Sequence, residues 1–354
     1  MKNYRRIIYV NYLTEALRIH ENSIVINAHY DLPGEVYHRR RNFNERSVLK
    51  KVYLSKLKEA GYNIIVAAVF LENQYCEENA YQYAIDQINE FSKDVEETNG
   101  HAKIIKRIDD FEDVITNNKI GFILSLEGVE PIGKKLEHLD EFYKLGVRAV
   151  GLLWSRKNEV GYPCSSDSEA NEKGLLSFGK TFVEECSKKN VLIDLAHISE
   201  GGFYEVINHS EKPIIVSHSN SKDVHDHHRN LSIDQIKAIQ LNGGVIGVNS
   251  LRIFIGNEDE HWVMKICDHI DSIIKHGSID NVGFGFDYCN DYIRYSPFLD
   301  VSIEEMKRKY DVMDSINDSL LITAELLKRG YSENDLKQVI GGNFARVIKE
   351  YLKT

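Results

Sequence analysis

Short apolar runs recur along the chain, and each is bounded by turn residues or followed by a helical pattern of apolar positions. The runs are rich in Val and Ile and almost continuously apolar. Strands that are covered on both faces need this composition, so the pattern favours a parallel sheet. The eight runs cover residues 23–29, 63–70, 121–128, 147–154, 191–197, 213–219, 244–250 and 281–287.

Amphipathic stretches between these runs predict helices. Examples lie at residues 46–61, 174–190 and 232–244. Eight strand-then-helix units in one chain predict a (β/α)8 TIM-like barrel of the α/β class. Further helical patterns at 301–330 and 332–354 would cover the barrel as extra C-terminal helices. Because the chain has only five prolines and no Ser/Gly-rich linker, we expect a single domain over residues 1–354.

Charge and cysteine usage narrow the class of protein. The 44 basic and 54 acidic residues give a net charge of −10, which argues against a nucleic-acid or anionic-membrane surface. The five cysteines are an odd number without short paired spacing, so they indicate neither a disulfide framework nor a zinc knuckle. We find no apolar run that reads as a signal peptide or a membrane span. We therefore expect a soluble cytoplasmic protein.

Titratable side chains stand at the carboxyl ends of five predicted strands, where the chemistry of such barrels takes place. Each alone has an ordinary explanation: an Asp before Pro33 suits a turn, and a single histidine is often satisfied within a core. Those explanations give no reason for all of them to share strand ends. A buried carboxylate or imidazole is costly unless it is paired or metal-bound, so we expect a metal site. The residues are His29, Asp31, Glu127, His197, His218 and Asp287.

This set of ligands constrains the metal and the reaction. Nitrogen and carboxylate oxygen without thiolate favour zinc, although manganese, cobalt or iron(II) would also fit. Three carboxylates and three histidines exceed the needs of one tetrahedral ion and fit two. A glutamate can bridge two ions about 3.5 Å apart that hold a hydroxide, and the pKa of the bound water falls to roughly 7. The chemistry predicted is hydrolysis.

Seven motifs in the chain together resemble the renal (membrane) dipeptidase family of zinc peptidases. They occur in family order from about residue 24 to 347, and the "SHS…RN" run at 217–230 is the most specific. The motifs are INAHYDLP, SLEGVEPIG, FYKLGVRAVGL, LIDLAHIS, PIIVSHSNSKDVHDHHRNL, GFGFD and GGNFARV. The resemblance implies the same barrel fold, two zinc ions per chain, a small dipeptide substrate and a possible homodimer.

The resemblance also implies a role for each matching residue. Arg229 would bind the C-terminal carboxylate of the substrate, and Asp287 would transfer protons. Glu127 would bridge the two ions. The implied zinc ligands are His29, Asp31 and Glu127 for one ion, and Glu127, His197 and His218 for the other.

Two positions depart from the family pattern. Trp154 stands where many members carry a substrate-contacting histidine, and indole can donate one hydrogen bond but cannot accept one. We expect Trp154 beside the substrate, although it could simply fill the barrel mouth. Cys289 replaces the second aspartate of the family's usual "DFDG", while Asp287 is retained.

Three further histidines, His225, His227 and His228, lie in the loop beyond the strand that ends near His218. We interpret them as exposed or substrate-rim residues rather than as a third metal site, because loops run over the surface.

The sequence thus predicts a dinuclear zinc dipeptidase whose metal-bridging hydroxide attacks the peptide carbonyl, with Glu127 and Asp287 as catalytic residues. Arg229 and Trp154 would contact the substrate. One alternative is a related barrel metallohydrolase acting on a non-peptide amide or lactone, which would have no use for Arg229. Another is a catalytically weak peptide-binding homologue, in which Trp154 has impaired turnover.

Overall fold

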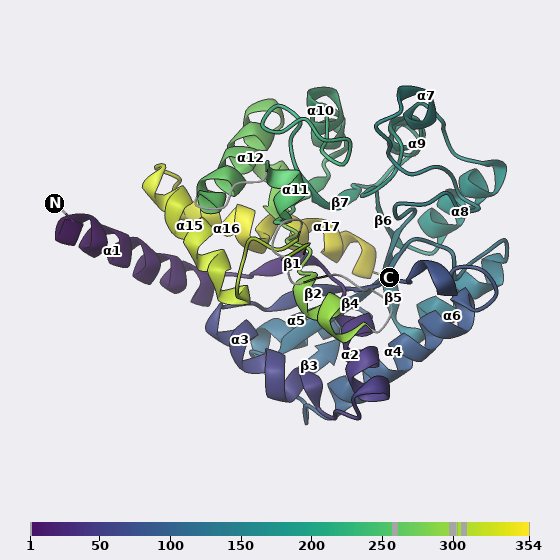
Figure 1. The fold of residues 1–354 in the computed structure, drawn as a ribbon, viewed down its shortest axis with the longest axis horizontal. Coiled ribbons are helices and arrows are strands. Elements are labelled where there is room, and N and C mark those ends of the chain that lie inside the picture. The colour runs from purple at the N-terminus through teal and green to yellow at the C-terminus, as the bar shows by residue number, and fades with distance from the viewer. Residues whose placement is uncertain (1, 257–260, 297–301, 303, 306–309, 354) are drawn as a thin grey trace.

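A closed barrel of eight parallel strands forms the centre of the computed structural model, which describes residues 2–256, 261–296, 302, 304–305 and 310–353 (Figure 1). Pairing of β2 with β4 closes the ring, and all strand pairs of the sheet are parallel. The barrel strands are β1 (Ile26–Tyr30), β2 (Ile64–Val69), β4 (Ile120–Glu127), β5 (Val147–Gly151), β6 (Leu192–Asp194), β7 (Ile215–Ser219), β8 (Val245–Val248) and β9 (Val282–Phe284). All eight predicted strands and the predicted fold class are confirmed.

A ninth strand, β3 (Ala102–Ile104), was not predicted. It pairs with the N-terminal half of β4, while β5 pairs with the C-terminal half of the same strand. Since β3 has only three residues, its sequence "AKI" carries too little apolar pattern to be recognised.

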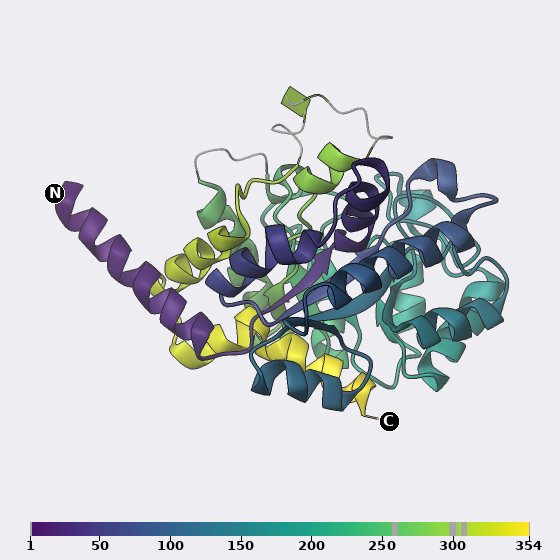
Figure 2. The same ribbon diagram turned by 90° about the horizontal axis from the view of Figure 1, so that it is seen from below.

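Helices surround the barrel, as both views show (Figures 1 and 2). Those before β6 are α1 (Lys2–Glu21), α2 (Leu32–Asn42), α3 (Leu54–Glu59), α4 (Ala80–Glu96), α5 (Ile108–Thr116), α6 (Leu136–Leu145), α7 (Ser168–Asn171) and α8 (Ser177–Lys188). Those after β6 are α9 (Glu200–Ile207), α10 (Ile233–Asn242), α11 (Arg252–Ile255), α12 (Trp262–His276), α13 (Asn290–Tyr295), α15 (Ser319–Lys328), α16 (Glu333–Lys337) and α17 (Asn343–Leu352). No helix among the described residues is long and apolar enough to cross a bilayer.

The predicted helices are largely present. The stretch 46–61 opens with a π-helical turn at Leu49–Tyr53 before α3 begins. The predicted pattern at 301–330 yields α15, while residues 301, 303 and 306–309 of it lie outside the described residues.

The inside of the barrel is an apolar core that is closed at its N-terminal end by α17 and α5 (Figure 2). Phe344 of α17 and Phe111 of α5 belong to this core, and Lys349 pairs with Glu112 at 2.9 Å across the two helices. The inward residues of the strands include Ile26, Ile64, Ile123, Leu192, Ile215 and Val245. Because one end of the barrel is packed with apolar side chains, the polar residues gather at the other end.

Candidate metal centre and active site

The six predicted site residues all lie at the C-terminal ends of the barrel strands. Their side chains are buried, with relative exposures of 1–7% for His29, Asp31, Glu127, His197, His218 and Asp287. His197 and Asp287 have positive φ angles of 67° and 61°, which are uncommon for residues other than glycine. Such backbone conformations are costly and tend to occur at functional sites, where the surrounding structure holds them.

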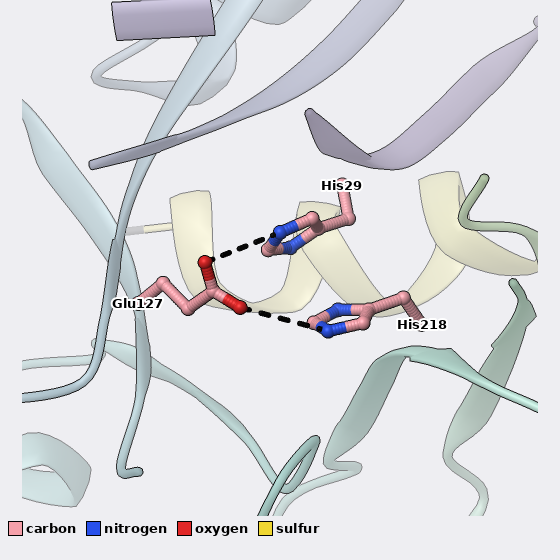
Figure 3. A group of neighbouring side chains, drawn as sticks. All are labelled: His29, Glu127 and His218. Carbon is pink, nitrogen blue, oxygen red and sulfur yellow. Dashed lines mark ion pairs between the residues drawn. The ribbon is translucent and has the colours of Figure 1, made fainter. Parts of the chain in front are cut away.

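Glu127, the last residue of β4, lies between two groups of histidines. Its Oε2 atom is 3.6 Å from Nε2 of His29, while its Oε1 atom is 3.1 Å from Nε2 of His197 and 3.6 Å from Nε2 of His218. Figure 3 shows this carboxylate with one oxygen directed toward His29 and the other toward His218. One carboxylate oxygen of Glu127 therefore faces His29, and the other faces His197 and His218.

On the His29 side of Glu127, two polar atoms are buried without a hydrogen-bond partner. They are Nε2 of His29 and Oδ1 of Asp31, which lie 3.5 Å apart. Oδ1 of Asp287 is 3.8 Å from the same His29 nitrogen. Buried polar atoms without partners are costly, and nitrogen and carboxylate donors that converge in this way suit a divalent cation. The donors present here therefore fit a metal centre.

The electrostatics of the carboxylates support the same interpretation. Burial raises the pKa of Asp287 to about 6, with a further rise from the charge of Glu127, while His29 opposes the shift. Burial and Glu127 also raise the pKa of Asp31 well above its usual value. Three carboxylates this close cannot all be ionised in a buried site without added positive charge. A bound cation would supply that charge.

On the second side of Glu127, His197 and His218 direct their Nε2 atoms toward one another at 2.8 Å. The Ser217 hydroxyl donates a hydrogen bond to Oδ2 of Asp194 at 2.5 Å and lies 2.7 Å from Nδ1 of His218. Because the Ser217 hydroxyl donates its hydrogen bond to Asp194, its oxygen is available to accept a hydrogen bond from the Nδ1–H group of His218. In that tautomer the Nε2 atom of His218 carries no proton and keeps a free lone pair. This is the tautomer that a metal ligand requires.

Close strand packing places Ser217 in this position. A Cβ atom built on Gly285 would lie 1.8 Å from the carbonyl oxygen of Ser217, and one on Gly247 would lie 2.0 Å from it. Only glycine therefore fits at these two positions beside β7.

Sequence reasoning missed three residues that support the site: Asp194, Ser217 and Asn249. Asn249 donates a hydrogen bond from Nδ2 to Oδ2 of Asp287 at 3.0 Å. All three are polar and buried within or just after apolar strands. A polar residue inside such a run was the available signal, because it must find a partner in the core.

Arg229 is buried, with a relative exposure of 7%. Its Nη2 atom donates a hydrogen bond to the carbonyl oxygen of His218 at 3.3 Å, and its Nε atom has no partner. Among the described residues, no carboxylate forms an ion pair with it. A buried guanidinium that has donors to spare and lies next to the candidate metal ligand His218 is suited to bind a carboxylate group of a substrate.

Trp154 lies beside the candidate metal centre, at a ring-centroid distance of 6.2 Å from His197. Phe70 contacts it edge-on at 4.9 Å, and the guanidinium of Arg156 lies 4.9 Å from its ring. Arg156 itself pairs with Glu130 at 2.8 Å. Trp154 is thus held in place at the edge of the site.

Of the three loop histidines, His228 is exposed, while His225 and His227 are half-buried. The ring of His227 stacks on that of His228 at 4.3 Å, and its Nδ1 atom accepts a hydrogen bond from the backbone N–H of Arg229. The clusters of potential metal ligands found within the described residues include none of these three. His228 lines the same recess as Arg229 and His197.

The chain belongs to the membrane dipeptidase family, peptidase family M19, whose sequence pattern matches residues 13–354. It is 26% identical over 287 residues to an uncharacterized dipeptidase, C965.12, of Schizosaccharomyces pombe, covering 75% of this chain and 68% of that protein. It is therefore a metal-dependent hydrolase of the dipeptidase family, and the predicted family resemblance is confirmed.

Two solved structures share the fold. One is a metallo peptidase from Rhodobacter sphaeroides bound to a phosphinate mimic of the dipeptide L-Ala-D-Ala, with a TM-score of 0.79 and 21% identity over 92% of this chain and 99% of that one. The other is the M19 metallo peptidase named dipeptidase AC, with a TM-score of 0.80 and 21% identity over 94% of this chain and 99% of that one. At these identities the likeness bears on the fold alone.

Proposed function

We propose that the protein is a dinuclear zinc dipeptidase that hydrolyses the peptide bond of small dipeptides. The observation that carries this proposal is the placement of Glu127, whose two carboxylate oxygens face His29 on one side and His197 and His218 on the other. A carboxylate that faces two groups of nitrogen ligands is suited to bridge two ions.

His29, Asp31 and Glu127 would hold one zinc ion, and Glu127, His197 and His218 would hold the second. When bound, such ions supply Lewis acidity, which activates water and stabilises negative charge on a carbonyl oxygen. Asp287 also lies close to the residues that would hold the first ion, since its side chain clusters with those of His29 and Asp31.

Asp287 would act as the proton-transfer group. Its Oδ2 atom is fixed by Asn249, and its Oδ1 atom is directed toward the ligands of the first group. It would accept a proton from the attacking water and return it to the leaving amine, so that one group serves as base and then as acid.

Arg229 would bind the C-terminal carboxylate of the dipeptide. The side chain is buried, its Nε atom is unpaired, and no described carboxylate neutralises it. This arrangement favours a peptide with a free carboxyl group over a non-peptide amide or lactone. The dipeptide mimic bound to the Rhodobacter sphaeroides peptidase is consistent with a substrate of this size.

Two measurements test the proposal. Elemental analysis of the metal-reconstituted protein should find about two zinc ions per chain. The same protein should hydrolyse a panel of dipeptides and leave the matching dipeptide amides nearly intact. Failure to bind metal, or equal rates on free acids and amides, would contradict the proposal.

A further inference from the structure

A polar recess beside His197 contains a second cation near Arg229. The recess is lined by residues from the β6–α9 and β7–α10 connections and from the segment that follows β5. Lys222 and Arg229 are the two permanently charged basic residues of its lining. Asn171, Glu200 and His228 are further polar residues of the lining.

The fold of the β7–α10 loop brings Lys222 close to Arg229. Ser221 and Leu231 form a parallel bridge, and the backbone N–H of Lys222 donates to the carbonyl oxygen of Leu231 at 2.9 Å. Leu231 in turn donates from its N–H to the carbonyl oxygen of Asn220 at 2.8 Å. These contacts bring the two ends of the loop together, with Lys222 near its start and Arg229 near its end.

The recess has an excess of positive charge. Among the residues that the structure describes, no carboxylate forms an ion pair with Lys222 or Arg229. Of the described residues that line the recess, Glu200 alone is acidic, and its Oε2 atom accepts a hydrogen bond from Asn171 Nδ2 at 3.4 Å. Burial lowers the pKa of His228, and the positive charges of Arg229 and Lys222 lower it further. Both cations therefore lie close enough to the His228 ring to affect its ionisation.

We propose that Lys222 is a specificity-determining residue that selects dipeptides whose C-terminal residue has a carboxylate side chain. Arg229 would bind the main-chain carboxylate, and Lys222 would bind the side-chain carboxylate of an aspartate or glutamate. This inference rests on the proposed dipeptidase function. Two cations that have no carboxylate partner among the described residues, on one recess, suit a ligand with two carboxylates, because hydrogen bonds between charged groups are stronger than those between neutral groups.

Isosteric substrates provide the test. For the metal-loaded protein, kcat/KM for Ala-Asp should exceed that for Ala-Asn by about tenfold or more, and Ala-Glu should exceed Ala-Gln in the same way. The variant Lys222→Met, which keeps the length of the apolar stem, should bring both ratios close to one. Lys222→Arg, which keeps the charge, should retain the preference.

Lys237→Met is the matched control. Lys237 is an exposed lysine of α10 that pairs with Asp234, so its removal changes the net charge by the same amount away from the recess. Its acid-to-amide ratios should equal those of the unmodified protein. Equal rates on Ala-Asp and Ala-Asn in the unmodified protein, or a preference that survives Lys222→Met, would overturn the inference.

Binding of free aspartate separates this inference from the dipeptidase proposal. By calorimetry, the metal-loaded protein should bind aspartate at least about tenfold more tightly than asparagine, and Lys222→Met should remove the difference. A Lys222-dependent preference for aspartate without turnover of any dipeptide would support the role proposed for Lys222 and contradict the proposed dipeptidase function. Turnover of dipeptides without any preference for acidic residues would support the dipeptidase function and contradict the role proposed for Lys222.

Discussion

Asn249 donates a hydrogen bond from its side-chain amide to Oδ2 of Asp287 at 3.0 Å, and both side chains are buried. The contact fixes the rotation of the Asp287 carboxylate, so that Oδ1 points toward His29. An amide at position 287 could still offer an oxygen to Asn249. Asparagine at this position can therefore keep the hydrogen bond to Asn249, while it removes the negative charge and the ability to transfer a proton.

We expect Asp287→Asn to retain both metal ions while kcat falls. Loss of a positioned general acid–base typically lowers the rate by about 10²- to 10⁴-fold. Steady-state kinetics on a good dipeptide, together with elemental analysis of the same sample, checks this. An unchanged kcat would assign proton transfer to another group, and loss of metal would assign Asp287 to the ligands.

Glu127→Gln should lower metal occupancy and activity together, because the substitution removes a negative charge that both ions would share. Mutation of outer hydrogen-bond partners of metal ligands already costs about 10- to 100-fold in metal affinity, and loss of a shared ligand should cost at least as much. Metal titration by calorimetry measures the effect.

Glu130→Gln is the matched control for this experiment. Glu130 lies three residues further along, on the connection that follows β4, and its carboxylate pairs with Arg156. It should bind metal as the unmodified protein does. A Glu127→Gln variant with full metal affinity would contradict the bridging role.

Arg229→Ala should weaken turnover of dipeptides by about 10- to 100-fold, since a hydrogen bond to a charged group contributes about 1.5–3 kcal/mol. The rate on dipeptide amides, which lack the carboxylate, should barely change from its low starting value. Comparison of kcat/KM for each acid and its amide checks the prediction. An equal loss on both substrates would indicate a structural role for the arginine.

His20 should make the stability of the protein depend on pH. The ring is fully buried and contacts the carbonyl oxygen of Ala60 and the hydroxyl of Thr323, each at 2.8 Å. Burial lowers its pKa to about 4, although Ala60 opposes the shift. Between this value and the unfolded value of about 6.5, the unfolded chain binds more protons, so stability falls as the pH decreases. At pH 5 the loss from this group is about 2 kcal/mol.

Thermal or denaturant unfolding at pH 7.5 and pH 5 tests this difference. The variant His20→Gln should lose less stability between the two pH values than the unmodified protein. His101→Gln, which changes an exposed histidine, serves as the control and should follow the unmodified protein. Identical pH dependence in His20→Gln would show that His20 is not responsible.

The strands were predictable because each is covered on both faces and its sequence is therefore apolar almost throughout. The same runs located His29, Glu127 and His218, since each lies at or near the end of a strand. The left-handed backbone of His197 and Asp287 was not predictable, because it depends on the packing of neighbouring strands.

The hydrogen bonds that support the candidate site residues could not be predicted from the sequence either. Asp194 and Ser217 are 23 residues apart in the chain, and Asn249 and Asp287 are 38 apart. Neither pair leaves a local periodicity that a single sequence could reveal. Such contacts become visible only when the closed barrel brings the strands together.

The closure of the barrel by α17 has a consequence for synthesis on the ribosome. This helix is translated after all nine strands, yet its side chains complete the apolar core between Ile26, Ile64 and the other inward residues. At about 5 to 20 residues per second, the nascent chain spends seconds with every strand made and one end of its core uncovered. Native packing of the core must therefore wait until α17 has left the exit tunnel, and until then the apolar residues that α17 covers remain exposed to solvent.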